Sequence, residues 1–393
     1  MNILYYIPAI GQEMGGIRQY AVALLKILSK DTGNKYFIYH EVNDPEIMAV
    51  LNHNTQLKLI ETSKANKKEW NVFLNKVKRK ASAYFTRFSK TKLENDLLDK
   101  ICKKHQIDII HCPYQYLPQS KNTKSICTMH DVQELHFPEY FSPEDRAYRA
   151  VHYLEYIKHA DKIIVSYQHI KNDIIKYFQT PADKIQVCLL EMDNLWFDKY
   201  SVTDIEPLIS IGINGAFIFY PANTWQHKNH YKLLEALTLL KEQGFSAIKV
   251  VCTGHKTPYF ENVLKPFIEQ HKLHDQIIFA GILEEKLLYS LYKKCRGVIV
   301  PTLYEAGSFP LMESILLDVP VICSNVTSLP ETIGDMSFVF DPEDATDISQ
   351  KLKQLWEDDE YRKKSIENCH KQAIRLKSTG AFDKIMALYS SLN

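Results

Sequence analysis

The chain has 393 residues, and 48 Lys and Arg against 47 Asp and Glu give it a formal net charge of +1 at pH 7. This length exceeds a single hydrophobic core and predicts two domains. The near-zero charge gives no overall attraction for nucleic acid, so we expect no nucleic-acid partner and only local charge effects.

Hydrophobic residues make up 45% of the chain. We find neither a leader sequence nor an apolar stretch long enough to span a bilayer, which predicts a globular protein of the cytoplasm. The eight cysteines are scattered singly, without a C-x-x-C pair, and several lie in apolar runs, such as Cys127, Cys252 and Cys323. We expect buried reduced thiols, and neither a disulfide framework nor a metal site.

The first predicted strand, residues 3–7, leads to Gly15 and Gly16, which open a helical pattern with an apolar face that includes Leu24 and Leu28. Paired glycines let the backbone come close to a ligand at a helix N-terminus, although such a pair is usually only a turn. The G-x-G-x-x-G dinucleotide pattern is absent, which disfavours an NAD-dependent oxidoreductase.

Short apolar runs then alternate with helical patterns along the whole chain. Strand, helix and strand in succession predict parallel sheets with right-handed crossovers, an α/β fold of two doubly wound, Rossmann-like domains. We place the first domain at 1–200, the second at 210–377, a hinge in the polar stretch 198–215 and a last helix at about 378–393. After the first strand, the predicted strands are 36–40, 57–60, 107–112, 125–129, 162–166, 186–190, 216–220, 248–253, 277–281, 298–301, 319–323 and 337–340.

Residues 64–92 form a basic segment with ten Lys and Arg, one acidic residue, Glu69, and aromatic residues at helical spacing from Trp70 to Phe88. A basic amphipathic helix of this kind is typical of a protein that lies on an anionic membrane surface. A helix packed on its own domain with a solvated basic face explains the pattern equally well.

His130 and Asp131 end the predicted strand 125–129. The carboxyl ends of parallel strands form the ligand-binding edge of such a sheet, where the imidazole can hydrogen-bond a sugar hydroxyl and Asp131 can orient the ring. A lone histidine is more often structural, so both interpretations stand at this point. Lys228, at a strand-to-helix turn after the strand 216–220, can neutralise a diphosphate without a metal, although a lone lysine is commonly just solvated.

The most informative motif follows the strand 298–301, where a small-residue turn leads to Pro310 and the start of a helix. Its free amides and positive dipole end attract phosphate. Glu305 in the turn and Glu313 in the helix can accept hydrogen bonds from hydroxyl groups. A ligand that is part phosphate and part polyol fits both features, and a nucleotide sugar is such a ligand.

The spacing of Glu305 and Glu313 resembles the E-x7-E signature of the retaining GT-B glycosyltransferases of family 4, also called group 1. The similarity continues through Leu329-Pro330-Glu331 and Phe340-Asp341-Pro342. His227-Lys228-Asn229-His230 is similar to a subgroup rich in mannosyl- and rhamnosyltransferases. This resemblance implies that the two domains face each other across a cleft and that the last helix packs back on the first domain.

The resemblance also implies roles for individual residues. Lys228 and the amides near the helix start would hold the diphosphate, Glu305 the sugar hydroxyls, Glu313 the ribose and His130 the transferred sugar. Many relatives carry an arginine where this chain has Asn223, which leaves phosphate binding there in question. The remaining residues of the implied donor site are Gly15, Gly16, Asn223, Gly254, Ile282, Gly307, Ser308 and Phe309. Gly254 serves equally well as a simple turn glycine.

The implied reaction is a retaining, metal-independent transfer of a hexose, of mannose or rhamnose type, from a GDP- or dTDP/UDP-linked donor without a further cofactor. The implied acceptor is a glycan or a polyprenyl-linked saccharide in bacterial surface polysaccharide synthesis, such as that of lipopolysaccharide. This places the protein in the cytoplasm, at the inner face of the cell membrane if residues 64–92 bind lipid. The alternatives are a noncatalytic nucleotide-sugar-binding scaffold and a GT-B phosphorylase or synthase.

Overall fold

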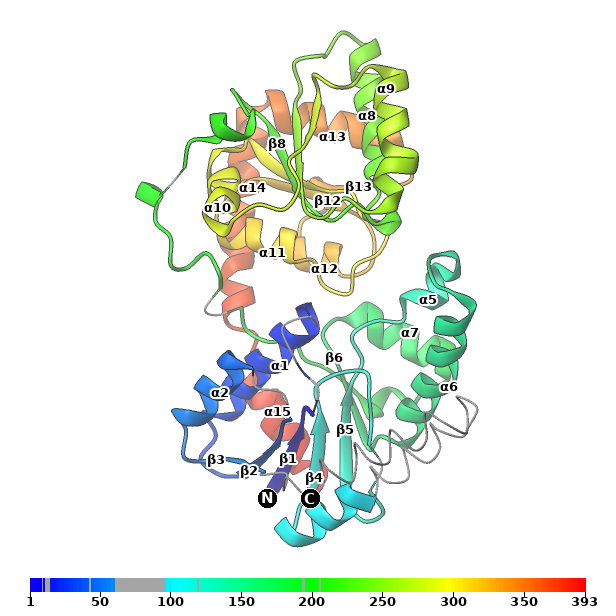
Figure 1. Cartoon of the computed structure of the whole chain (residues 1–393), viewed down its shortest axis with the longest axis vertical. Helices are drawn as coiled ribbons and strands as arrows, with labels where there is room; N and C mark the ends of the chain where they lie inside the picture. The colour runs from blue at the N-terminus through cyan, green and yellow to red at the C-terminus, as the bar shows by residue number, and fades with distance from the viewer. Residues whose placement is uncertain are drawn as a thin grey trace, which may run out of the picture. The chain divides into compact units, whose positions relative to one another are not determined.

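A computed structural model describes residues 1–8, 10, 15–41, 44–60, 96–118, 120–192, 195–204 and 206–393 (Figure 1). The chain forms two compact units. The first unit comprises Met1–Glu134, Phe141–Glu191 and Gly380–Asn393, and the second comprises Leu135–Tyr140 and Met192–Thr379. The basic segment 64–92 lies outside the described residues, so its membrane or packing role stays a prediction.

The first unit is built on a parallel sheet of seven strands in the order β3-β2-β1-β4-β5-β6-β7. Its strands are short runs rich in Ile, Val and Leu, as expected of strands covered on both faces. After β1 the chain adds β2 and β3 on one side of that strand, and β4 to β7 follow on its other side. The switch point of the sheet therefore lies between β1 and β4. The strands are β1 (Asn2–Tyr6), β2 (Lys35–Tyr39), β3 (Leu57–Leu59), β4 (Ile109–Cys112), β5 (Lys124–Thr128), β6 (Lys162–Val165) and β7 (Ile185–Val187).

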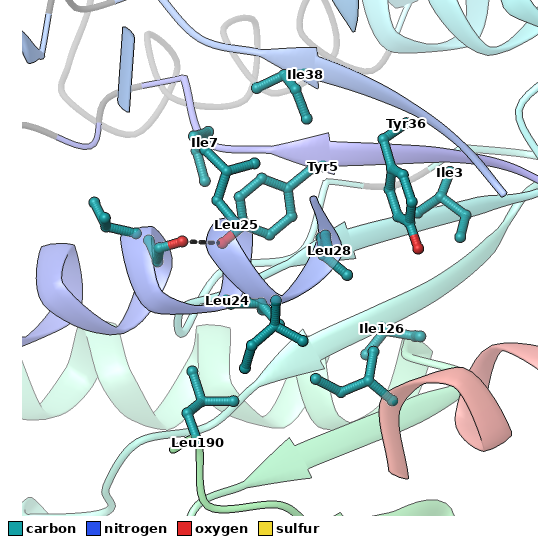
Figure 2. Close-up of a cluster of buried hydrophobic side chains, with 14 of the residues drawn as sticks. Ile3, Tyr5, Ile7, Leu24, Leu25, Leu28, Tyr36, Ile38, Ile126 and Leu190 are labelled. Atoms are coloured by element: carbon teal, nitrogen blue, oxygen red, sulfur yellow. Dashed lines mark hydrogen bonds between the residues drawn. The ribbon is translucent and has the colours of Figure 1, made fainter. Parts of the chain in front are cut away.

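The helices of the first unit bury apolar stripes against this sheet. In α1, Ala21, Leu24, Leu25 and Leu28 recur at helical spacing and are almost completely buried beside the strand residues (Figure 2). The hydroxyl of Tyr5 donates to the Ala21 carbonyl at 2.7 Å and so fixes α1 on β1. The helices of this unit include α1 (Gly15–Leu28), α2 (Pro45–Asn52), α6 (Pro143–His159), α7 (Gln168–Phe178) and α15 (Ala381–Ser390), and α5 (Gln133–His136) crosses into the second unit.

The last helix, α15, belongs to the first unit although nearly two hundred residues of the second unit precede it. Its buried residues Ala381, Ile385 and Leu388 pack in the same core as α1 and β1. Its Tyr389 hydroxyl lies 2.7 Å from Nδ1 of His111, a fully buried residue of β4. The chain end is therefore held by apolar packing and by a buried polar pair.

The second unit has a six-stranded parallel sheet in the order β10-β9-β8-β11-β12-β13. Its switch point lies between β8 and β11. The strands are β8 (Ile218–Pro221), β9 (Val250–Thr253), β10 (Ile277–Phe279), β11 (Gly297–Val300), β12 (Val321–Ser324) and β13 (Val339–Phe340). The α-helices are α8 (His230–Glu242), α9 (Lys265–His271), α10 (Glu285–Lys294), α11 (Phe309–Leu316), α12 (Leu329–Ile333), α13 (Ala345–Glu357) and α14 (Asp359–Lys377).

The structure confirms two doubly wound α/β units, and each predicted strand overlaps an observed one. The boundary between the two units lies between Glu191 and Met192, earlier in the chain than the predicted hinge at 198–215. The polar stretch 198–215 lies inside the second unit, where Glu206 pairs with Lys286 of α10 at 2.5 Å. The backbone N–H of Glu206 also donates to the Ser290 hydroxyl at 2.6 Å. All eight cysteines are free thiols.

Candidate functional site

The loop after β8 places Lys228 at the carboxyl edge of the second sheet. A short 3-10 turn, Gln226–Lys228, ends in Asn229, whose left-handed backbone conformation (φ 59°) starts α8. The Asn229 amide donates to the carbonyls of Pro301 and Pro342, at 2.9 and 2.8 Å. The Tyr220 hydroxyl donates to the Lys228 carbonyl at 2.7 Å. Three hydrogen bonds therefore hold the backbone around Lys228 in place.

The loop after β11 places Glu305 beside it. The hydroxyl of Thr302 donates to the His227 carbonyl at 2.8 Å, which ties this loop to the preceding one. The Glu305 N–H donates to the hydroxyl of Thr327 at 3.2 Å. Lys228 Nζ and Glu305 Oε1 form an ion pair across the β8–β11 switch point, with side-chain exposures of 18% and 12%. The family resemblance implies separate roles for Lys228 and Glu305, whereas the structure brings the two side chains into contact.

The N-terminus of α11 lies directly after this loop. Ser308 occupies the N-cap position and is 1% exposed, yet its hydroxyl has no hydrogen-bond partner among the described residues. The first intrahelical bond of this turn runs from the Met312 N–H to the Ser308 carbonyl, which leaves the N–H groups of Phe309 and Leu311 without a helical partner. The Ser308 hydroxyl and the N–H groups of Phe309 and Leu311 thus offer donors beside Gly307, where the helix dipole favours an anion.

Glu313, in the second turn of α11, is held by two neutral donors. The indole N–H of Trp196 donates to Oε1, and the hydroxyl of Tyr292 donates to Oε2, both at 2.6 Å. Burial raises the pKa of Glu313, and the two hydrogen bonds oppose that rise. Sequence reasoning missed Trp196 and Tyr292. The available signal was that a buried tyrosine or tryptophan usually finds a partner for its polar tip.

Asn223 and Gly254 join the loops that follow β8 and β9. The Asn223 Oδ1 atom accepts a hydrogen bond from the His255 N–H at 2.6 Å. A Cβ on Gly254 would lie 2.8 Å from the Asn223 backbone N and Oδ1, and its φ of +108° also favours glycine. This hydrogen bond to Asn223 therefore links the loop after β8 to the loop after β9. Ile282, after β10, is 76% exposed at the same edge of the sheet.

In the first unit, His130 follows β5 at the carboxyl edge of the sheet. Its Nε2 atom lies 3.0 Å from the Pro113 carbonyl, which follows β4. Because a carbonyl only accepts hydrogen bonds, Nε2 carries a proton, and Nδ1 of the neutral ring is an acceptor. Burial lowers the pKa of His130, which favours that neutral ring. Tyr20 of α1 packs edge-on against the imidazole, with ring centres 4.8 Å apart.

Asp131, beside His130 in the chain, has charged partners of its own, and its role in orienting the imidazole stays a prediction. Its Oδ1 atom accepts a hydrogen bond from Arg149 of α6 at 3.1 Å, and the same Arg149 nitrogen also bonds Glu134 at 2.9 Å. The hydrogen bond that the structure gives to the imidazole itself runs to the Pro113 carbonyl. Gly15 and Gly16 open α1, and most of the loop between them and β1 lies outside the described residues.

The structure thus places seven predicted residues of the second unit in the loops at its switch point or in the first two turns of α11, and Gly254 and Ile282 after the strands β9 and β10. In the part of the chain that is described, no group of three or more His, Cys, Asp and Glu side chains is arranged to hold a metal ion. The same residues include no helix that is long and apolar enough to cross a bilayer.

Two family models match this chain over separate ranges. The model described as "Glycosyl transferases group 1" matches residues 210–372, and the model described as "Glycosyltransferase Family 4" matches residues 15–188. Together the two ranges cover most of both units.

Individual proteins show the same similarity. The O-antigen chain mannosyltransferase B of Escherichia coli is 30% identical over 195 residues, which are 49% of this chain and 50% of that protein. The chain thus spans about half the length of this curated relative. A glycosyltransferase structure from Rickettsia africae superimposes with a TM-score of 0.70 at 20% identity and covers 100% of this chain and 98% of its own. Anabaena HepE, in complex with UDP and glucose, gives a TM-score of 0.66 at 16% identity with full coverage of both chains.

Proposed function

Because this chain belongs to the family 4, group 1 glycosyltransferases, we propose that it transfers a hexose from a nucleotide sugar to a glycan or lipid-linked saccharide. We place this reaction in the synthesis of a surface polysaccharide. The similarity to an O-antigen chain mannosyltransferase supports a donor of mannose or rhamnose type.

The observation that carries this proposal is the arrangement at the switch point of the second sheet. One cation, Lys228, lies there beside a carboxylate, Glu305, and the neighbouring helix α11 begins with unused amides and an unpaired buried hydroxyl. A diphosphate needs positive charge and N–H donors, and sugar hydroxyls need acceptors. The arrangement supplies both kinds of group within two adjacent loops.

The chemistry follows from where charge develops. As the bond between sugar C1 and the diphosphate oxygen breaks, negative charge builds on the diphosphate, and Lys228 with the α11 amides stabilises it. These groups act without a metal ion. The acceptor oxygen bonds to C1 on the same face, and its proton passes to the departing phosphate oxygen. The configuration at C1 is retained, and no side chain forms a bond to the sugar.

The ion pair gives this step a specific starting state. Before the donor binds, Glu305 neutralises Lys228, so neither charge is left unpaired in a partly buried position. A diphosphate is a stronger partner for the lysine because it carries more charge. Its binding releases Glu305, which then accepts hydrogen bonds from the sugar. His130 offers Nδ1 as an acceptor for another sugar hydroxyl.

Sugar transfer from GDP-mannose, dTDP-rhamnose and UDP-glucose to synthetic lipid-linked saccharides tests the proposal. We expect one donor to release its nucleoside diphosphate, with an α-linked product from an α-linked donor by NMR, and equal rates with and without EDTA. A product whose anomeric configuration is opposite to that of the donor would overturn retention. Binding of a sugar nucleotide without turnover on any acceptor would favour the scaffold alternative. Release of sugar 1-phosphate from a glucan in the presence of orthophosphate would favour a phosphorylase.

A further inference from the structure

The carboxylate of Glu313 is fixed by two donors that come from distant parts of the sequence. Trp196 precedes Glu313 by 117 residues and lies shortly after the division between the two units, whereas Tyr292 belongs to α10. Each donor bonds a different carboxylate oxygen, at 2.6 Å in both cases. Two bonds on opposite oxygens leave the carboxylate little freedom to rotate.

The two donors are themselves held in place by packing. Tyr292 is completely buried, and its ring meets Phe219 of β8 edge-on with ring centres 5.0 Å apart. The Trp196 ring lies 6.5 Å from that of Tyr292 and 5.4 Å from that of Phe197. Tyr292 belongs to the core of the second unit, and Trp196 is partly buried beside it, so packing within this unit sets the hydrogen-bond geometry at Glu313.

Glu313 differs from Glu305 in the charge of its partners. Among the described residues, Glu305 pairs with Lys228, whereas no lysine or arginine forms an ion pair with Glu313. Neutral donors stabilise the ionised carboxylate without removing its charge. A carboxylate has about four lone-pair positions, so after these two bonds each oxygen can still accept another hydrogen bond.

We propose that Trp196 and Tyr292 are positioning residues that hold the Glu313 carboxylate in the orientation in which it accepts hydrogen bonds from the ribose hydroxyls of the donor. This inference rests on the proposed function, because it assumes that a nucleotide binds at the start of α11. It assigns the two side chains no direct contact with the ligand. The ribose preference of the site thereby depends on the core between α10 and α11.

The proposal has a consequence for pH dependence. Burial raises the pKa of Glu313, and the Tyr292 and Trp196 hydrogen bonds lower it. Removing either donor therefore raises that pKa further, so the carboxylate takes up a proton at a higher pH. A protonated carboxyl has lost acceptor capacity, and the preference for ribose hydroxyls should then disappear at a higher pH than in the wild type.

The test is calorimetric titration of the full chain with GDP and UDP and with their 2′,3′-dideoxy forms. The variants are Y292F, which keeps the ring and removes only the hydroxyl, and W196F, which removes the indole N–H together with part of the ring and keeps an aromatic side chain. Y289F is the matched control, because Tyr289 lies one turn earlier in α10 and is buried beside Tyr200. E313Q shows the result when the charged acceptor itself is lost.

We expect the wild type to prefer the ribose form of the nucleotide that it binds. W196F and Y292F should reduce this preference by roughly tenfold, the usual effect of a hydrogen bond to a charged group, with little change in affinity for the dideoxy form. Y289F should retain the full preference. In both variants the preference should be lost at a higher pH than in the wild type.

The outcomes separate this inference from the proposed function. A full ribose preference in both variants, or an equal loss of affinity for the ribose and dideoxy forms, would overturn the positioning role and leave the proposed function standing. A wild type that binds nucleotides without any ribose preference would do the same. A wild type that binds neither GDP nor UDP in either form would contradict the proposed function, and the inference with it.

Discussion

The two sheets have the same doubly wound topology, yet the groups at their carboxyl edges differ in charge. At the second sheet, the Lys228–Glu305 ion pair lies beside the start of α11. At the first sheet, the Tyr20 ring and the Pro113 carbonyl contact His130, and the nearby charges are Arg149 and the two carboxylates that pair with it, Asp131 and Glu134. The fold provides the same edge twice, and the side chains make one suited to phosphate and the other to an uncharged saccharide.

The largest effect that this difference predicts is the loss of the Lys228 charge. K228A should lower kcat/KM for the sugar-nucleotide donor by about a hundredfold or more, because a group that stabilises developing charge is removed. K232A is the matched control, since Lys232 lies in the first turn of α8 and pairs only with Glu235 among the described residues. Near-normal turnover by K228A in a steady-state assay would show that the second edge does not stabilise the leaving group.

Acid should destabilise both units through one buried histidine in each. Burial lowers the pKa of His111 in the first unit and of His230 in the second to about 3. The unfolded chain takes up these protons near pH 6.5 and the folded chain does not, so the stabilising contribution is complete above pH 6.5 and falls as the pH decreases toward 3. Between pH 7 and 5 each histidine should reduce the free energy of unfolding by about 2 kcal/mol.

H230F can separate the two contributions, because His230 is enclosed by Tyr220 and Phe279, with ring distances of 4.7 and 5.7 Å. Hydrogen exchange at pH 7 and pH 5 should show a smaller acid effect in the peptides of the second unit and an unchanged one in the first. An acid effect in the second unit that is identical in H230F and the wild type would mean that another group is responsible.

Loss of the His130 imidazole should affect the sugar more than the nucleotide. H130A should lower kcat by about tenfold, within the range measured when a single hydrogen bond to a reacting substrate is removed. The affinity for the free nucleoside diphosphate should stay unchanged, in contrast to K228A. Titration of both variants with the same nucleoside diphosphate checks this. Equal loss of diphosphate affinity in H130A would contradict the division of roles between the two edges.

The smallest predicted effect concerns the attachment of α15. Y389F removes the hydroxyl that pairs with buried His111 and should lower the stability of the first unit by about 1 kcal/mol. Hydrogen exchange should become faster in the peptides of α15 and β4, while those of α13 stay unchanged. Unchanged exchange in α15 would show that apolar packing alone holds the last helix.

Features written in short stretches of sequence could be predicted, and features that depend on strand order could not. The strands follow from short apolar runs, and the motif from Glu305 to Glu313 carries its own strand, turn and helix signals. The contact between Lys228 and Glu305 joins residues 77 positions apart, through the adjacency of β8 and β11. No local sequence pattern predicts that β8 and β11 are neighbours in the sheet.

The partners of charged groups were hidden for the same reason. Asp131 is next to His130 in the sequence, yet it pairs with Arg149 on a helix that the motif does not include. Trp196 and Tyr292 belong to segments that carry no site signal of their own, and only the packing of the second unit brings them to Glu313. The residue types of the site could be predicted, but their hydrogen-bond partners required the three-dimensional structure.

A crystal structure of the protein with its sugar nucleotide would show directly whether the diphosphate binds at the switch point of the second sheet. We expect the diphosphate to bind Lys228 Nζ and the N–H of Phe309. Glu305 should leave Lys228 and accept a hydrogen bond from a sugar hydroxyl, and Glu313 should contact the ribose while still bonded to Trp196 and Tyr292. A diphosphate bound away from the start of α11, with the Lys228–Glu305 ion pair intact, would contradict this expectation.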